Sequence, residues 1–209
     1  MNGWLVVDKA AGMTSRDAVN RVQRWFPRGA KIGHTGTLDP LATGVLVLCI
    51  GSTTKLAHVV QGMGKSYTST FRLGATSDTD DADGTVTATL DAADPGEERV
   101  REALAGFVGT IEQLPPAFSA LKVNGERAYD LARKGTAVTL APRPVHVEAV
   151  RLVAYQWPFA EVEVDCGKGT YIRSIARDLG AKLGVGGLVA TLRRTRVGPF
   201  TADMGVTLD

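Results

Sequence analysis

Residues 33–44 read Gly-His-Thr-Gly-Thr-Leu-Asp-Pro-Leu-Ala-Thr-Gly and lie between a helical pattern and an apolar run at 45–50. Three glycines and a proline in twelve residues predict a loop that turns tightly or lets another group approach its backbone. Pro40 disfavours the α region for the residue before it, so Asp39 is expected at an extended or turned corner, just ahead of a buried strand. An Asx turn or a cap is the common role of such an aspartate. A working residue held by the scaffold is the alternative.

Composition bounds the class of protein. The chain has 209 residues, of which 44% are hydrophobic, so it can build a sizeable core, and we expect a single domain over residues 1–209. No apolar run approaches the roughly 20 residues of a membrane span, and the first residues lack the pattern of a secretory signal. Cys49 and Cys166 fall in strand-like apolar runs, which favours a reduced, cytoplasmic setting. Three scattered histidines and no Cys-x-x-Cys motif predict neither a metal site nor a metal cofactor.

The net charge of +2 conceals an asymmetry. Residues 76–102 hold nine of the 22 acidic side chains and two of the 24 basic ones, which leaves 22 bases against 13 acids elsewhere. A basic body of this kind suits a polyanionic partner, with the acidic segment held away from the contact. A surface charge that is simply uneven is the alternative interpretation.

The pattern of apolar residues predicts more strands than helices. Thr14, followed three residues later by Asp17, is a candidate capping box for a helix that Pro27 ends. Further helices are expected at 95–107, 126–134 and 170–183, the last closed by Gly184. Strands are expected at 3–8, 43–50, 65–73, 85–90, 145–155, 159–166 and 188–197. Because many neighbouring strands can pair as hairpins, the predicted fold class is α+β with a large, mostly antiparallel sheet.

Two aromatic side chains and an arginine suggest a ligand. Arg173 falls in the first turn of the helix at 170–183, where the helix dipole makes a cation unfavourable. Either an anion opposite Arg173 or solvation of its guanidinium would offset this unfavourable placement. Tyr67 and Tyr171 each lie close in sequence to a cation, Lys65 or Arg173, a combination that can hold a splayed nucleobase and its phosphates. Packing as half-buried core residues is the alternative.

The inventory of reactive groups fits one type of chemistry. A single constrained aspartate, an arginine to pair with it and aromatic side chains fit a lone nucleophile or base that acts on a nucleobase or sugar. Most glycosidases need two carboxylates, and no second one lies in a comparable loop. His34 can either stack on a base or cap its own loop.

Taken in order, these motifs resemble those of the TruB-type tRNA pseudouridine synthases. Residues 33–44 resemble the family's nucleophile motif, and Lys65-Ser66-Tyr67 resembles its tyrosine motif. The motifs that follow are Asp78–Gly84, Ser119-Ala120-Leu121-Lys122, Arg143-Pro144-Val145, Gly169-Thr170-Tyr171-Ile172-Arg173 and Leu192-Arg193-Arg194-Thr195. The likeness runs from about Trp4 to the C-terminus. It implies the pseudouridine-synthase fold, a large mixed sheet flanked by helices, and isomerisation of the T-loop uridine at tRNA position 55.

The resemblance assigns the chemistry to three side chains. Asp39 would be the nucleophile, attacking either the uracil ring or the anomeric carbon of the ribose. Arg173 would pair with Asp39, and an opposing cation lowers the pKa of a carboxylate and keeps it ionised. Tyr67 would stack on the flipped uracil and help to remove the C5 proton.

The resemblance also implies roles in binding. Tyr171 and Leu192 would line the pocket. His34 would enter the T-loop stack as the target base leaves it, and stacking would offset the cost of flipping. Lys9 would touch the RNA or support the loop.

The chain departs from the family in two places. The family has Lys-Pro where this chain has Lys9-Ala10, which predicts a more flexible turn. Many members also carry a C-terminal PUA-type module, which we expect to be absent here. The expected partner is tRNA, bound through its T-arm by a monomer without a cofactor, a membrane contact or a protein partner. A tRNA-elbow binding and folding chaperone is the alternative function, and it would tolerate loss of Asp39 or Arg173, which this chain retains.

Overall fold

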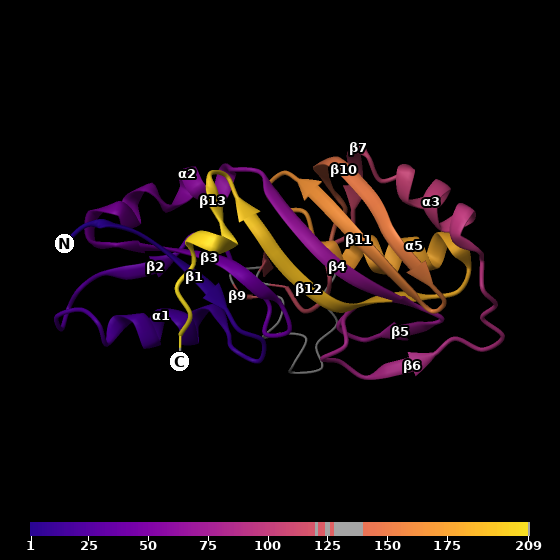
Figure 1. The fold of residues 1–209 in the computed structure, drawn as a ribbon, viewed down its shortest axis with the longest axis horizontal. Coiled ribbons are helices and arrows are strands. Elements are labelled where there is room, and N and C mark those ends of the chain that lie inside the picture. Colours follow the sequence, from indigo (N-terminus) through magenta and orange to yellow (C-terminus); the bar gives the residue numbers. More distant parts are fainter. Residues whose placement is uncertain (120, 124–125, 128–139, 209) are drawn as a thin grey trace. The chain divides into compact units, whose positions relative to one another are not determined.

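The computed structural model describes residues 1–119, 121–123, 126–127 and 140–208. Within these residues, nine strands form a mixed sheet with hydrogen-bonded neighbours in the order β1-β3-β12-β4-β11-β10-β7, while β2 pairs with β3 and β13 with β12 (Figure 1). The backbone contacts divide the chain into two compact units. Unit 1 comprises Met1–Thr68, Asp165–Lys168 and Leu192–Asp209, and unit 2 comprises Ser69–Val164 and Gly169–Thr191. The strands β4 (Lys65–Leu73), β11 (Phe159–Cys166) and β12 (Gly187–Val197) contribute residues to both.

Unit 1 is built around β3, whose residues from Gly44 to Ile50 are all buried. β3 pairs antiparallel with β1 and β2 and parallel with β12, through Arg193 and Arg194. One apolar cluster joins Val6, Val47 and Val197, and Trp4 packs beside it with its ring 6.4 Å from that of Phe200. The elements of this unit are β1 (Gly3–Lys9), α1 (Ser15–Gln23), β2 (Ile32–His34), β3 (Thr43–Ile50), the 3-10 helix η1 (Gly51–Leu56), α2 (Ala57–Gly62), β13 (Phe200–Thr201) and the 3-10 helix η2 (Ala202–Met204).

Unit 2 packs helices against antiparallel strands. α3 contacts both β10 and α5. Val100 and Leu104 of α3 and Ile175 and Leu179 of α5 are buried. β10 pairs antiparallel with β7, and two small hairpins, β5–β6 and β8–β9, lie outside the main sheet. The elements are β5 (Ala75–Ser77), β6 (Val86–Ala88), α3 (Glu97–Ala105), β7 (Gly109–Gln113), β8 (Lys122–Val123), β9 (Glu126–Arg127), β10 (Arg143–Gln156) and α5 (Ile172–Leu183).

The predicted α+β class with a large mixed sheet is confirmed. Thr14 caps α1 in the predicted capping box: its Oγ1 accepts from the Asp17 amide at 3.1 Å, while Asp17 Oδ2 accepts from the Thr14 amide at 3.0 Å. Gly184 ends α5 in the left-handed conformation, as predicted. α1 ends at Gln23 rather than at Pro27. The helix predicted at 126–134 is wrong at residues 126–127, which form strand β9 by pairing with β8, and residues 128–134 lie outside the described residues.

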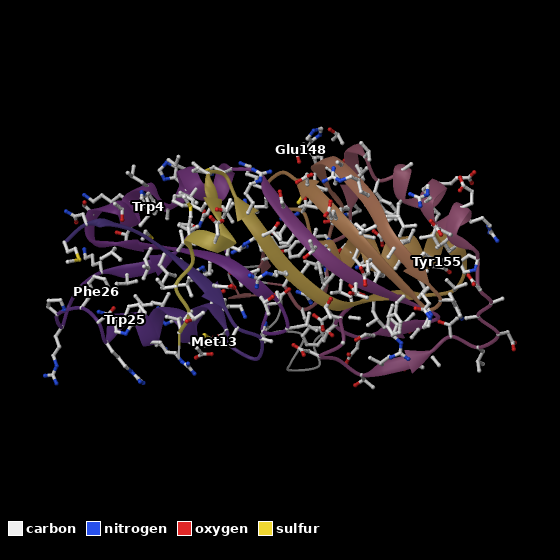
Figure 2. The ribbon with its side chains drawn as sticks, viewed as in Figure 1. Trp4, Met13, Trp25, Phe26, Glu148 and Tyr155 are labelled. Atoms are coloured by element: carbon white, nitrogen blue, oxygen red, sulfur yellow. The ribbon has the colours of Figure 1, made fainter. Side chains whose placement is uncertain are left out.

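Figure 2 shows the side chains on these elements, with Trp4, Met13, Trp25 and Phe26 labelled in unit 1 and Glu148 and Tyr155 in unit 2. Trp25 follows α1 and is 56% exposed. Tyr155 on β10 donates a hydrogen bond to Asp94 Oδ1. No helix in the described part of the chain is long and apolar enough to cross a membrane.

Candidate active site

The loop that carries Asp39 connects β2 to β3 and is fixed at its entry by Thr35. The Thr35 amide and hydroxyl both donate to the Val47 carbonyl, at 3.0 and 3.1 Å. After Asp39 the chain turns, and the Ala42 amide donates to the Asp39 carbonyl at 3.1 Å. Thr35 and Ala42 are buried, whereas Asp39 is partly exposed. The sequence prediction of a turned corner ahead of a buried strand is therefore confirmed.

Both chain neighbours of Asp39 are held by hydrogen bonds from the N-terminal segment. On one side, Ser15 Oγ accepts from the Leu38 amide at 2.8 Å and donates to the Leu38 carbonyl at 3.1 Å. On the other side, the Pro40 carbonyl accepts from the Gly12 amide at 2.9 Å and from Lys9 Nζ at 3.3 Å. Because the restraints lie immediately before and after Asp39, they limit where its carboxylate can point.

Lys9 is only 1% exposed, and its ammonium also donates to the carbonyls of Ala10 and Met13 at 2.9 and 2.6 Å. Of the two roles predicted for Lys9, these contacts favour support of the loop. The hydrogen bond to Pro40 reaches the loop directly, although the family's proline is missing from the turn.

Arg194 on β12 holds the same loop from another side. Its guanidinium donates from Nε to the Val45 carbonyl at 2.8 Å, from Nη1 to the Thr37 carbonyl at 3.4 Å and from Nη2 to the Gly36 carbonyl at 3.3 Å. The side chain is 3% exposed. One buried arginine therefore joins the incoming arm of the loop to the strand that follows it.

The close approach of β12 requires the glycine at position 44. Gly44 pairs with Arg194 and has φ +96°, a conformation that side chains disfavour. A Cβ atom at this position would lie 2.2 Å from the Arg194 carbonyl oxygen, far inside van der Waals contact. Gly44 thus lets the arginine backbone reach the end of the Asp39 loop.

Tyr67 on β4 is 8% exposed and lies within the electrostatic reach of Asp39 and Arg194. Burial raises the pKa of the Tyr67 hydroxyl, and the charge of Arg194 acts in the opposite direction. Cys166 on β11 and Asp39 each raise the Tyr67 pKa further, because negative charge near the hydroxyl disfavours the phenolate. These residues all belong to unit 1.

Lys65, the cation next to Tyr67 in sequence, has a different role from the one predicted. It is 9% exposed and donates to the carbonyls of Gln61 and Met63 at 3.0 and 2.6 Å. Burial and then the charge of Arg194 lower the Lys65 pKa. The cation whose charge acts on Tyr67 is therefore Arg194, which lies far from Tyr67 in sequence.

His34 and Leu192 also belong to unit 1. His34 ends β2 opposite Leu48 of β3 and is partly buried. Leu192 is 8% exposed and precedes Arg194 by two residues on β12, so the two side chains share a face of the strand. Their predicted contacts with the base and the T-loop stay predictions.

Tyr171 belongs to unit 2, where it forms the N-cap of α5. The buried Gln113 side chain accepts from the Tyr171 amide at 2.8 Å and donates to the Tyr171 carbonyl at 3.1 Å. The Arg143 guanidinium lies over the tyrosine ring, 5.2 Å from its centroid, and donates to the Gly169 carbonyl at 2.8 Å. Backbone and ring of Tyr171 are thus both held in place.

Arg173, also in unit 2, is 4% exposed, which excludes the solvated arginine considered from the sequence. Its guanidinium lies 3.3 Å from Asp81 Oδ2 and donates to the carbonyls of Thr79 and Phe118 at 2.8 and 3.0 Å. Asp81 is itself 4% exposed. The anion that compensates the cation in the first turn of α5 therefore includes Asp81, while the predicted pair between Arg173 and Asp39 stays a prediction.

Sequence reasoning missed Ser15, Gln113, Asp81 and Arg194 as supports. Asp81 and Arg194 lie inside motifs that resemble those of the family, but the resemblance gave no role to either residue. Ser15 and Gln113 act through backbone atoms of distant residues, and no local pattern marks such a contact. In the described residues, no group of three or more His, Cys, Asp or Glu side chains gathers so as to hold a metal ion.

Solved structures identify the class of fold. The chain superposes on a chain of a Cbf5-Nop10-Gar1 complex with a TM-score of 0.76 and 28% identity, covering 99% of this chain and 52% of that one. A chain from a structure of an H/ACA RNP bound to a substrate RNA containing 2′-deoxyuridine gives a TM-score of 0.72 at 25% identity, covering 99% of this chain and 51% of that one. This chain therefore spans about half the length of those chains. A pseudouridylate synthase at 17% identity shares the fold, with a TM-score of 0.50.

The fold is that of the pseudouridine synthases. The model of the TruB family pseudouridylate synthase N-terminal domain matches residues 24–172, and that of the tRNA pseudouridylate synthase B C-terminal domain matches residues 173–209. The chain belongs to the TruB family of pseudouridylate synthases. A tRNA pseudouridine synthase B from Ruegeria sp. (strain TM1040) is 52% identical over all of this chain and 69% of its own length. One from Mycobacteroides abscessus is 49% identical over 99% of this chain and 71% of its own length.

Proposed function

We propose that this protein isomerises uridine to pseudouridine in tRNA, at the T-loop uridine of position 55, with Asp39 as the nucleophile. The observation that carries the assignment of Asp39 is the set of hydrogen bonds on both sides of it, from Ser15 to Leu38 and from Lys9 and Gly12 to Pro40. A surface turn does not need restraints of this density. A nucleophile does, because a small displacement of a reacting atom costs much of the rate.

The proposed reaction balances without a co-reactant. The bond between uracil N1 and ribose C1′ breaks, the ring turns, and C5 bonds to C1′. The C5 proton leaves and N1 gains a proton, so substrate and product are isomers. Asp39 attacks the uracil ring or C1′, which divides a difficult exchange into two easier steps through a covalent intermediate.

The flipped base needs a stacking surface and an ionised nucleophile. Tyr67 supplies a buried aromatic ring in the same unit as Asp39, and Leu192 a buried apolar side chain. We propose that His34 replaces the target base in the T-loop stack, and that Tyr171 and Arg173 complete the site as wall and counter-ion of Asp39. Lys9 supports the loop. Base flipping costs a few kcal/mol, which stacking and phosphate contacts offset.

Tritium release from tRNA transcript labelled at C5 of uridine tests this function directly. We expect release by the wild-type protein and by Asp91→Asn, in which an exposed carboxylate is removed from a residue with φ +56° that asparagine tolerates. Asp39→Asn is expected to reduce release to background while its tRNA affinity stays within a few fold. Pseudouridine should map to the T-loop, and a transcript reduced to the T-arm stem-loop should still react.

Two outcomes contradict the proposal. Release by Asp39→Asn at the wild-type rate removes the nucleophile. No release by the wild type, with tRNA binding and refolding intact, favours the tRNA-elbow chaperone instead. Light scattering of the purified protein and fractionation of cells test the remaining expectations, a monomer located in the cytoplasm.

A further inference from the structure

Arg194 is placed to hold together the two arms of the Asp39 loop. It is 3% exposed and donates to three carbonyls, of Gly36, Thr37 and Val45, which lie before and after Asp39 in sequence. A buried guanidinium whose donors meet the backbone on both sides of the nucleophile limits how far the two arms of the loop can separate.

The neighbouring arginine of the same strand is used differently. Arg193 makes a bidentate ion pair with Asp8 of β1, at 2.8 and 3.0 Å, and its side chain is 39% exposed. Alternate residues of a strand point to opposite faces, so Arg193 and Arg194 project away from each other. Position 194 therefore differs from position 193 in burial, in partners and in its relation to Asp39.

We propose that Arg194 is a positioning residue of the isomerisation, which holds the two arms of the Asp39 loop together through one buried guanidinium. This inference rests on the proposed function. The donors of its planar fork serve three carbonyls at once, whereas a lysine ammonium cannot span the same set of acceptors. The geometry of the fork, and not the positive charge alone, carries the role.

Single-turnover tritium release with enzyme in excess over tRNA tests the proposal, alongside filter-binding affinity and the melting temperature. Arg194→Lys and Arg194→Gln are each expected to lose about 100-fold in rate, the cost of misplacing a reacting group by about an ångström. Their tRNA affinity should stay within about threefold. Arg193→Gln is the matched control, because it removes the same charge from the same strand, and it should keep the rate within about threefold.

Hydrogen exchange tests whether Arg194 holds the loop. Hydrogen exchange at residues 36–39 should be faster in Arg194→Lys than in the wild type, since the lysine cannot hold both carbonyls of the loop.

The outcomes separate this inference from the proposed function. An inactive wild-type protein contradicts the function itself. With an active wild type, either of two results overturns the role of Arg194. One is a full rate in either Arg194 variant, and the other is a parallel loss of rate, affinity and melting temperature in both variants, which indicates a merely structural residue.

Discussion

Removal of the Ser15 hydroxyl is expected to lower both the stability of the fold and the rate of isomerisation. Ser15 is 3% exposed and makes two hydrogen bonds with the backbone of Leu38, the residue before Asp39. Ser15→Ala leaves the buried Leu38 amide and carbonyl without these partners. A typical hydrogen bond contributes about 1 kcal/mol, and a buried group left unsatisfied costs about 1–3 kcal/mol, so we expect a loss of roughly 2–4 kcal/mol.

That loss has a thermal and a kinetic consequence. For a chain of this size, each kcal/mol shifts the melting temperature by about 2–4 °C, so Ser15→Ala should melt roughly 5–15 °C lower. Alanine is a good helix former, so the first turn of α1 itself should be little affected. With its preceding residue released, Asp39 should shift, and the single-turnover rate of tritium release should fall by about 100-fold.

Thr14→Ala is the matched control for this prediction. Thr14 caps the same helix, but its side-chain hydrogen bonds go to Asp17 and not to the loop. Loss of the cap should cost about 1 kcal/mol and leave the rate within about twofold. If Ser15→Ala and Thr14→Ala turn over at the same rate at a temperature where both are folded, the anchor at Leu38 does not position Asp39, and the reasoning is refuted.

Three further predictions concern single sites. Tyr67→Phe should keep the stacking surface and lower the single-turnover rate by about 10²-fold or more, as expected for loss of a group that transfers a proton; an unchanged rate removes the hydroxyl from the mechanism. Gly44→Ala should fail to fold or melt far below the wild type in a calorimetric scan, because its Cβ would lie 2.2 Å from the Arg194 carbonyl, and wild-type melting would contradict the close approach. Hydrogen bonds from Thr14 lower the Asp17 pKa below its usual 3.8, so Asp17 stabilises the fold above its unfolded pKa and the contribution is lost as pH falls through the lowered pKa. The difference in melting temperature between wild type and Asp17→Asn should therefore be largest above about pH 5 and close at lower pH; a constant difference would show that the cap does not depend on ionisation.

Local chemistry explains why several elements could be predicted from the sequence. The Thr14–Asp17 capping box and Gly184 are signals that lie within a few residues of the helix ends they determine. The alternation of Val162, Val164 and other residues in β11 corresponds to one buried and one more exposed face. By contrast, η1 and α2 over residues 51–62 have little apolar periodicity, and the structure shows Val60 as the buried residue of α2. Their helical state depends on packing against the rest of unit 1.

The Asp39 loop could be predicted from the sequence, but the residues that anchor it could not. The glycines, Pro40 and the position ahead of an apolar run identify the Asp39 loop, because these features act on the backbone of the loop itself. The anchors could not be found in this way. Ser15 lies 23 residues from Leu38, and Arg194 lies 149 residues from Val45, so their roles follow from the register of distant strands and helices. The sequence shows which side chains can donate hydrogen bonds, but the tertiary fold determines which carbonyl accepts from each of them.

Arg173 illustrates the difference between a required charge and its source. A cation in the first turn of a helix is unfavourable without an anion nearby, so an anion opposite Arg173 was one of the two explanations that the sequence offered. The structure places Asp81 at 3.3 Å, within the segment that was expected to stay away from the functional surface. Asp80 of the same segment pairs with Arg177 one helical turn further along α5, at 2.8 Å. The acidic segment therefore compensates the arginines of α5 within unit 2. Because both Arg173 and Asp81 are buried, removal of either charged group is expected to be strongly destabilising, as is usual when one partner of a buried ion pair is lost.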